Sequence, residues 1–347
     1  MRIEGDLKLD YQDVLIRPKR STLQSRSEVD VTREFKFKNS GRHFSGVPIM
    51  TANMDTTGTF AMAKVLFEYK MITVLDKHYS VEQLKTFYNK LKDTEIDYVF
   101  YTMGILQSDL EKLNNFLKQV NQEKIVNLCI DVANGYTERF VDFIKLVRDK
   151  YPDKNIMAGN IATGEMAEQL VLSGADIVKI GIGPGSSCTT RKVTGVGYPQ
   201  LSATIECADA AHGVGGHVCA DGGLKVYGDI PKAFGAGADF VMSGNLFAAH
   251  DESGGEVVKK DGKKFMEYYG SSSKKAMDKY NNGVADYRTS EGKEVLIEYR
   301  GPVKNTVQGI LGGLRSACTY VGAKRLKELP KRTTFVRVSE QLNNLHN

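Results

Sequence analysis

The stretch NIMAGNIATGEMAEQLVLSGADIVKIGIG, residues 155–183, contains the unit that decides the fold. It begins and ends with short apolar runs rich in β-branched residues, which is typical of strands buried on both faces. Between these runs lie helix-forming residues with apolar positions at helical spacing. Two neighbouring strands that are joined through a helix run parallel. The stretch therefore predicts a strand–helix–strand unit of a parallel sheet.

The same kind of unit recurs along the chain. We expect eight strands, which begin at Val47, Ile72, Tyr98, Asn127, Asn155, Ile177, His217 and Phe240. Helical patterns separate them, and Ser80 and Thr137 are expected to cap two of these helices. Eight such units predict a (β/α)8 TIM barrel of the α/β class. A doubly wound open sheet is the alternative.

We expect residues 1–347 to form a single barrel domain with an N-terminal extension over about residues 1–45. After the eighth strand, a polar segment over about residues 248–300 precedes the last helix, which should begin near Pro302. Alternating runs on both sides of Asp261-Gly262 predict a hairpin within this segment. Because the segment would lie above the barrel mouth, we interpret it as a flap or lid.

Composition narrows the classes of function. The net charge is +5, and the basic residues are spread along the chain, which does not favour a nucleic-acid partner. No apolar run is long enough to span a membrane, and the charged N-terminus lacks a signal sequence, so we expect a cytoplasmic protein. The five cysteines show no metal-binding or disulfide spacing, and we expect four of them to be buried hydrophobes.

Polar residues and glycine-bearing turns follow the predicted strands. Catalytic and binding groups of such barrels lie at the carboxyl ends of the strands. The turns GPGS, DGG and SGN follow the sixth, seventh and eighth strands, and glycine allows backbone N–H groups to approach a phosphate closely. A dinucleotide fingerprint is not met, because Ser186 stands where the third glycine would be required.

The fifth cysteine, Cys188, lies in the stretch GIGPGSSCTTR, residues 181–191. A thiol on a glycine-rich loop beside a phosphate site is expected to be partly exposed in an electropositive setting, which favours the thiolate. Such a nucleophile suits attack on an electron-poor carbon such as C2 of a purine ring.

The stretches LKLDYQDVLIRPKRST, NMDTTGTF, DVANGY, AGNIATGEM, GIGPGSSCTTRKVTGVGYPQLSA and GGLRSACTYVGA resemble the family of IMP dehydrogenases and GMP reductases. The similarity covers about residues 7–336 and is strongest to the reductase branch. The chain has no room for the regulatory module that dehydrogenases carry between the second and third strands, and YRTSEGK contains Glu291 where reductases have their glutamate. The resemblance implies NADPH-dependent reductive deamination of GMP to IMP and ammonia in a homotetramer.

The resemblance also implies a role for individual residues. Cys188 would form a covalent thioimidate with the purine, and Thr190 with Glu291 would move protons. Substrate contacts would come from Ser186, Asp221, Gly222, Gly223, Gly244, Asn245, Ser271, Ser272, Arg288 and Gly292. Cofactor contacts would come from Ser25, Arg26, Lys77, Asp131, Val132, Ala133, Ile182, Gly183, Tyr287, Ser316, Ala317, Cys318 and Thr319. A potassium ion would bind at Gly183, Gly185, Cys188 and Arg191.

Three positions depart from the pattern of the family, namely Asp76, Asn245 and Ser271. A carboxylate at Asp76, beside the expected cofactor residue Lys77, is predicted to weaken the attraction for an anionic cofactor slightly; a side chain that points away is the alternative. Two other functions stay open at this point. They are IMP dehydrogenase chemistry, which needs water as nucleophile, and a weakly catalytic sensor of purine nucleotides.

Overall fold

Eight parallel strands close into a barrel in the computed structural model, which describes residues 1, 3–280, 283 and 289–339. The strands are β4 (Ile49–Thr51), β5 (Ile72–Val74), β6 (Val99–Met103), β7 (Asn127–Asp131), β8 (Asn155–Ile161), β9 (Ile177–Ile180), β10 (His217–Asp221) and β11 (Phe240–Ser243). They follow one another in chain order, and β11 pairs with β4 to close the barrel, with Val241 opposite Ile49. All eight predicted strands and the predicted TIM barrel are confirmed.

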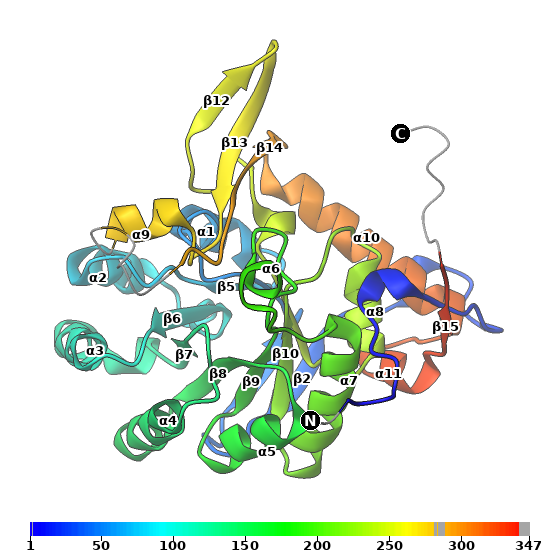
Figure 1. The fold of residues 1–347 in the computed structure, drawn as a ribbon, viewed down its shortest axis with the longest axis horizontal. Helices are drawn as coiled ribbons and strands as arrows, with labels where there is room; N and C mark the ends of the chain where they lie inside the picture. Colours follow the sequence, from blue (N-terminus) through cyan, green and yellow to red (C-terminus); the bar gives the residue numbers. More distant parts are fainter. Residues whose placement is uncertain (2, 281–282, 284–288, 340–347) are drawn as a thin grey trace.

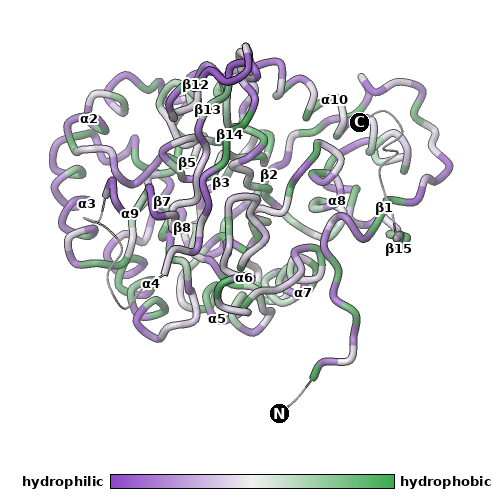
Figure 2. The backbone as a smooth tube through the Cα atoms, turned by 45° about the horizontal axis from the view of Figure 1, so that its top comes forward, coloured by the Kyte–Doolittle hydropathy of each residue, from purple (hydrophilic) through white to green (hydrophobic). Residues whose placement is uncertain are grey.

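A helix follows each strand on the outside of the barrel (Figure 1). These helices are α1 (Phe60–Phe67), α2 (Val81–Lys90), α3 (Gln107–Gln119), α4 (Glu138–Lys150), α5 (Gly164–Leu172), α7 (Gln200–Gly213), α8 (Asp229–Gly235) and α10 (Val303–Val321). The side chains of Ser80 and Thr137 accept the N–H groups of Gln83 and Phe140, so both predicted caps are confirmed. Hydrophilic and hydrophobic residues alternate along most of these helices (Figure 2), because one face of each is buried; α8, which is buried almost all round, is an exception.

A hairpin near the N-terminus closes one end of the barrel. Its strands, β2 (Arg33–Lys36) and β3 (His43–Gly46), pair antiparallel. The rings of Phe35 and Phe44 lie 4.7 and 5.5 Å from the ring of Phe240, the first residue of β11. The hairpin therefore covers the amino ends of the strands. The opposite rim, where the strands end, is the one that carries function in this fold.

The other N- and C-terminal elements lie against each other. They are η1 (Tyr11–Asp13), β1 (Val14–Ile16), η2 (Arg26–Glu28), η6 (Leu326–Glu328), α11 (Leu329–Arg332) and β15 (Phe335–Arg337). The strands β1 and β15 pair antiparallel, and η2 packs against α10. Two further turns, η3 (Ile96–Tyr98) and η4 (Gln122–Lys124), precede barrel strands. Within the described residues, no helix is long and apolar enough to cross a bilayer.

Residues 248–300, between β11 and α10, form a segment that we call the flap. It follows η5 (Asn245–Phe247) and contains β12 (Val257–Lys260), β13 (Lys263–Tyr269), α9 (Lys274–Tyr280) and β14 (Glu294–Glu298). The predicted hairpin is β12–β13, whose turn residues Asp261 and Gly262 both have positive φ, 51° and 76°. The hairpin projects from the body of the molecule, whereas α9 lies beside α1 and α2 (Figure 1).

A charged cluster below the barrel joins the N-terminal hairpin to α7 and β11. The buried carboxylate of Asp239 accepts a hydrogen bond from His212 Nε2 at 2.7 Å, from the Val218 N–H at 3.0 Å and from Arg33 at 3.3 Å. Burial opposes ionisation of Asp239, but the hydrogen bonds and the charges of His212 and His217 lower the pKa of this carboxyl. The hydrogen bond with Asp239 raises the pKa of His212. His217 lies 3.4 Å from the carboxylate as well.

The substitution Asp239→Asn should lower the free energy of unfolding by about 2 kcal/mol at about pH 6. The contribution of Asp239 is lost as pH falls through its lowered folded pKa, and that of His212 is lost as pH rises through its raised folded pKa. The difference from the wild type should therefore be largest between about pH 4 and about pH 6.5. Urea unfolding at several pH values measures it, with the exposed pair variant Asp142→Asn as control. A pH-independent difference would contradict the ionic explanation.

Candidate active site

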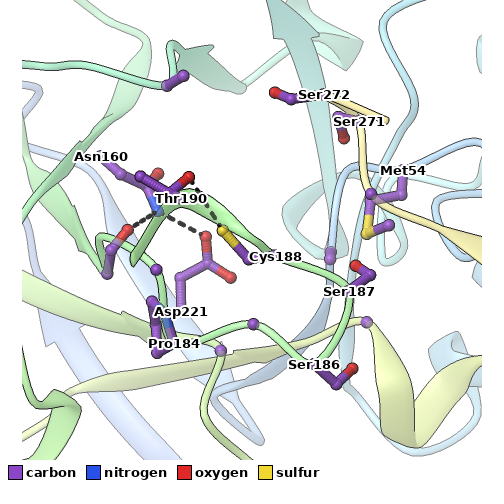
Figure 3. Close-up of a pocket in the computed structure, with 18 of the residues that line it drawn as sticks. Met54, Asn160, Pro184, Ser186, Ser187, Cys188, Thr190, Asp221, Ser271 and Ser272 are labelled. Carbon is purple, nitrogen blue, oxygen red and sulfur yellow. Dashed lines mark hydrogen bonds between the residues drawn. The ribbon is translucent and has the colours of Figure 1, made fainter. Parts of the chain in front are cut away.

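The carboxyl ends of the barrel strands surround a polar cavity with a volume of about 220 Å³ (Figure 3). Most of the site residues predicted from the sequence line it: Asp131, Val132, Ala133, Ile182, Gly183, Gly185, Ser186, Cys188, Thr190, Asp221, Gly222, Gly223, Gly244, Asn245, Ser271, Ser272 and Glu291. They come from the last residues of β7 and β10, the segments that follow β7, β9, β10 and β11, and the flap. Closure of the barrel thus assembles residues that are far apart in the chain.

The glycine-rich loop after β9 presents Cys188 to this cavity. The N–H of Cys188 donates to the carbonyl of Gly185 at 3.0 Å, so the loop forms a tight turn before the short helix α6 (Thr190–Thr194). Gly183 has a φ of 83°, and a Cβ there would meet the side chain of Arg191 at 2.5 Å. Arg191 in turn binds Asp10 at 2.9 Å, which pairs its charge. As predicted, Cys188 is partly exposed and the other four cysteines are buried.

A chain of hydrogen bonds leads from the thiol into the flap. Cys188 Sγ donates to Thr190 Oγ1 at 3.2 Å, and Thr190 Oγ1 donates to Glu291 Oε2 at 2.7 Å. The backbone supports this arrangement, because the N–H of Thr189 donates to the carbonyl of Glu291 at 2.8 Å. The side chains of Cys188 and Thr190 face each other in Figure 3. The sequence places Glu291 about a hundred positions after the thiol, and the structure brings it within proton-transfer reach through one hydroxyl.

Lys179 is a component of the site that the sequence reasoning missed. Its ammonium is buried and binds Asp131 at 2.7 Å and Asp221 at 2.8 Å. Burial alone would lower the pKa of Lys179, but the two carboxylates raise it well above its usual value. Asn160 donates a second bond to Asp221 at 2.9 Å, as Figure 3 shows. A lysine inside the apolar run IVKIGIG was the available signal.

Two glycine turns and a tyrosine shape the other side of the cavity. Gly222 and Gly223 have φ values of 86° and 79°, which residues with a side chain rarely adopt. A Cβ at Gly244 would meet the hydroxyl of Tyr268 at 2.4 Å. Tyr268, also missed by the sequence reasoning, is buried in the cavity wall, and its burial raises the pKa of its phenol. Close-packed glycines leave backbone N–H groups for an anionic ligand, and the phenol of Tyr268 beside them donates to Met54 Sδ at 3.7 Å.

Several predicted residues lie outside this lining. They are Ser25, Arg26, Lys77, Arg191, Gly292, Ser316, Ala317, Cys318 and Thr319. Gly292 lies nearby, in a backbone bridge to Cys188. The thiol of Cys318 is fully buried in the core beneath α10, and burial raises its pKa to about 12. The predicted cofactor contact of Cys318 would therefore have to come from its backbone and stays a prediction.

Two further predictions, for Tyr287 and Arg288, fall on residues outside the described part of the chain. In that described part, no group of three or more His, Cys, Asp or Glu side chains is placed to hold a metal ion.

The sequence is similar to known proteins over nearly its whole length. A family model described as IMP dehydrogenase / GMP reductase domain matches residues 8–344. GMP reductase of Aeromonas salmonicida is 58% identical over 346 residues, covering 100% of this chain and 99% of that protein. GMP reductase 2 of Homo sapiens is 58% identical over 98% of this chain and 97% of its own length. GMP reductase of Edwardsiella ictaluri is 60% identical over 99% of this chain and 98% of its own length. The chain belongs to the IMP dehydrogenase / GMP reductase family.

Proposed function

We propose that the protein is an NADPH-dependent GMP reductase, which converts GMP to IMP and ammonia through a covalent intermediate on Cys188. The observation that carries this proposal is the hydrogen-bond chain from Cys188 through Thr190 to Glu291. The relatives that bear the name GMP reductase match over nearly their whole length, which supports the same assignment. The decisive test is loss of NADPH absorbance when GMP is added, with IMP and ammonia formed in equal amounts.

One proton passes from the thiol to the leaving amino group. Cys188 Sγ attacks C2 of GMP, the C2–N bond breaks, and a thioimidate remains on the enzyme. The amino group needs one proton to leave as ammonia, and the thiol releases one when it attacks. Thr190 and Glu291 form a path on which this proton can be held and delivered, because each bond of the chain already points from the sulfur toward the carboxylate. The arrangement thus balances the deamination step without a proton from bulk water.

The substrate would lie across the cavity, with its ribose near Asp221 and its phosphate near the glycine turns. Lys179 and Asn160 hold the carboxylate of Asp221, and an ionised carboxylate accepts bonds from ribose hydroxyls. Ser186, Gly222, Gly223, Gly244 and Asn245 would hold the phosphate. Ser271 and Ser272 would contact the base from the flap side, together with Arg288 and Gly292. The phenol of Tyr268 would be one further hydrogen-bond donor near the phosphate.

The wall opposite the substrate fits the nicotinamide end of NADPH. Asp131, Val132, Ala133, Ile182 and Gly183 share the cavity with the thiol, so a cofactor bound there would face C2 of the purine. When bound, NADPH supplies the hydride that replaces the amino group. Asp131 is kept ionised as an acceptor, because Lys179 lowers its pKa even though burial opposes this.

The remaining groups complete the proposal. Lys77, which follows β5, would approach the cofactor from the carboxyl end of that strand. A potassium ion would be held by the carbonyls of Gly183, Gly185 and Cys188, next to a guanidinium of Arg191 whose charge Asp10 already pairs. Tyr287 would contact the cofactor as well. The cofactor's adenosine end would be contacted by a neighbouring subunit of a cytoplasmic homotetramer, through Ser25, Arg26, Ser316, Ala317 and Thr319. Their elements η2 and α10 pack together, which supports a shared surface.

The variant Cys188→Ala should lose turnover completely and still bind GMP, because the ribose and phosphate contacts belong to other residues. Calorimetry measures binding, and the NADPH assay measures turnover. Mass spectrometry of the wild-type enzyme quenched with GMP should show a purine adduct on the peptide that contains Cys188. Steady-state activity in the variant, or an adduct on another cysteine, would refute the assignment of the nucleophile.

The variant Glu291→Gln should slow deamination by about 10² to 10⁴, the usual contribution of a proton-transfer group. Hydride transfer should fall much less, because that step places no proton on a departing nitrogen. Rapid mixing with GMP measures ammonia release, and mixing with IMP and NADP⁺ measures the burst of NADPH. An equal fall of both steps would mean that Glu291 only positions the flap.

The variant Lys179→Met should raise KM for GMP at least about tenfold and lower the free energy of unfolding by about 3 kcal/mol, because two carboxylates lose a buried partner. The double variant Lys179→Met/Asp131→Asn removes one of these charges and should recover part of the stability. Thermal unfolding and steady-state kinetics measure the two effects. Unchanged stability in the single variant would contradict a structural role for this ion pair.

A further inference from the structure

The carboxylate of Asp55 receives three donors from the flap. Asp55 follows β4 on the rim of the barrel, and its Oδ2 accepts bonds from Tyr269 Oη at 2.5 Å, Tyr280 Oη at 2.7 Å and Lys279 Nζ at 3.0 Å. Burial opposes ionisation of this group, but the hydrogen bonds from the two tyrosines lower the pKa of Asp55. A single rim carboxylate therefore binds the residue that ends β13 and two residues that end α9.

A second rim contact holds the same helix end. The imidazole of His78, which follows β5, stacks on the ring of Tyr280, with centroids 3.5 Å apart and planes 10° from parallel. The ring of His78 is fixed from below, because Asp76 Oδ1 lies 2.9 Å from its Nδ1 and Asp76 Oδ2 accepts the backbone N–H of His78 at 3.3 Å. Asp76 is only 7% exposed. Its carboxylate thus serves as the partner of His78, and this favours a role different from a charge effect on the neighbouring Lys77.

These contacts lie at both ends of the segment that enters the cavity. Tyr269 and Tyr280 bind the same carboxylate, and the residues between them include Ser271 and Ser272, which line the cavity. The carbonyl of Ser272 accepts the N–H of Glu291 at 3.1 Å, and Ser273 and Gly292 form a backbone bridge. The position of α9 is therefore transmitted to the carboxylate that ends the proton path.

We propose that Asp55, Asp76, His78 and Tyr280 form a latch that holds the flap on the barrel rim and so positions Glu291 and the two flap serines. This rests on the proposed function for its catalytic consequence, and it assigns the four residues as positioning residues. The latch joins the ends of β4 and β5 to α9. Asp76 acts in it through His78, by fixing the ring on which Tyr280 stacks.

The first test is Tyr280→Phe, which removes the hydroxyl and keeps the ring. Loss of one hydrogen bond to a charged group should lower kcat for GMP about fivefold or more and leave KM for NADPH unchanged. Amide exchange of residues 272–280 should quicken by a similar factor. The matched control is Asp278→Asn, which removes an exposed ion pair with Lys274 on the same helix and should change neither quantity. Unchanged exchange in Tyr280→Phe would overturn the latch.

The second test separates the latch from a simple charge effect at Asp76. Asp76→Asn keeps an acceptor for His78, so the latch predicts nearly wild-type kcat, whereas Asp76→Ala should lower kcat several-fold at any salt concentration. A charge effect predicts the same fall of KM for NADPH in both variants, and this fall should shrink as salt rises. That second pattern would overturn the role of Asp76. Amide exchange is measured without substrate, so it tests the latch even if the wild type shows no GMP reductase activity.

Discussion

The ammonium of Lys179 is the contact on which the barrel mouth depends. It lies between the carboxylates that end β7 and β10, at 2.7 and 2.8 Å, and it is only 2% exposed. A buried charge is tolerated when its partners are close, and removal of the lysine would leave two carboxylates without a compensating charge. Three strand ends are thereby fixed relative to one another. Both carboxylates line the cavity, so the same ammonium aligns two of its walls.

The local signals in the sequence were sufficient for the fold. The apolar runs gave eight strands in the right order, Ser80 and Thr137 marked helix starts, and Asp261-Gly262 marked a hairpin, because each of these patterns acts over a few residues. The covering of the amino ends by Phe35 and Phe44 was not foreseen. It depends on contacts with Phe240 about two hundred positions later, which no local pattern reports.

The site was predictable to a lesser extent. Cys188 and the glycine turns carry their chemistry in their own neighbourhood, and most of the residues predicted from the resemblance line the cavity. Lys179 and Tyr268 were missed because their roles arise only when strands and flap meet. The burial of Cys318 was predictable as well, because its spacing from Leu311 and Leu314 on α10 matches a buried helical face.

The flap links substrate binding to proton transfer, because two of its backbone groups are hydrogen-bonded to the loop that carries the thiol. Lys293 donates its N–H to the carbonyl of Ser187 at 2.8 Å, and Thr189 donates to the carbonyl of Glu291, so the segment before β14 that carries Glu291 pairs with the loop that carries Cys188. If the flap opened, it would break these bonds together with the bond from Thr190 to Glu291. The thiol would then lose its proton path whenever the cavity was open to water. The chain from Cys188 to Glu291 is thus complete only while the flap lies against the glycine-rich loop, as it does in this structure.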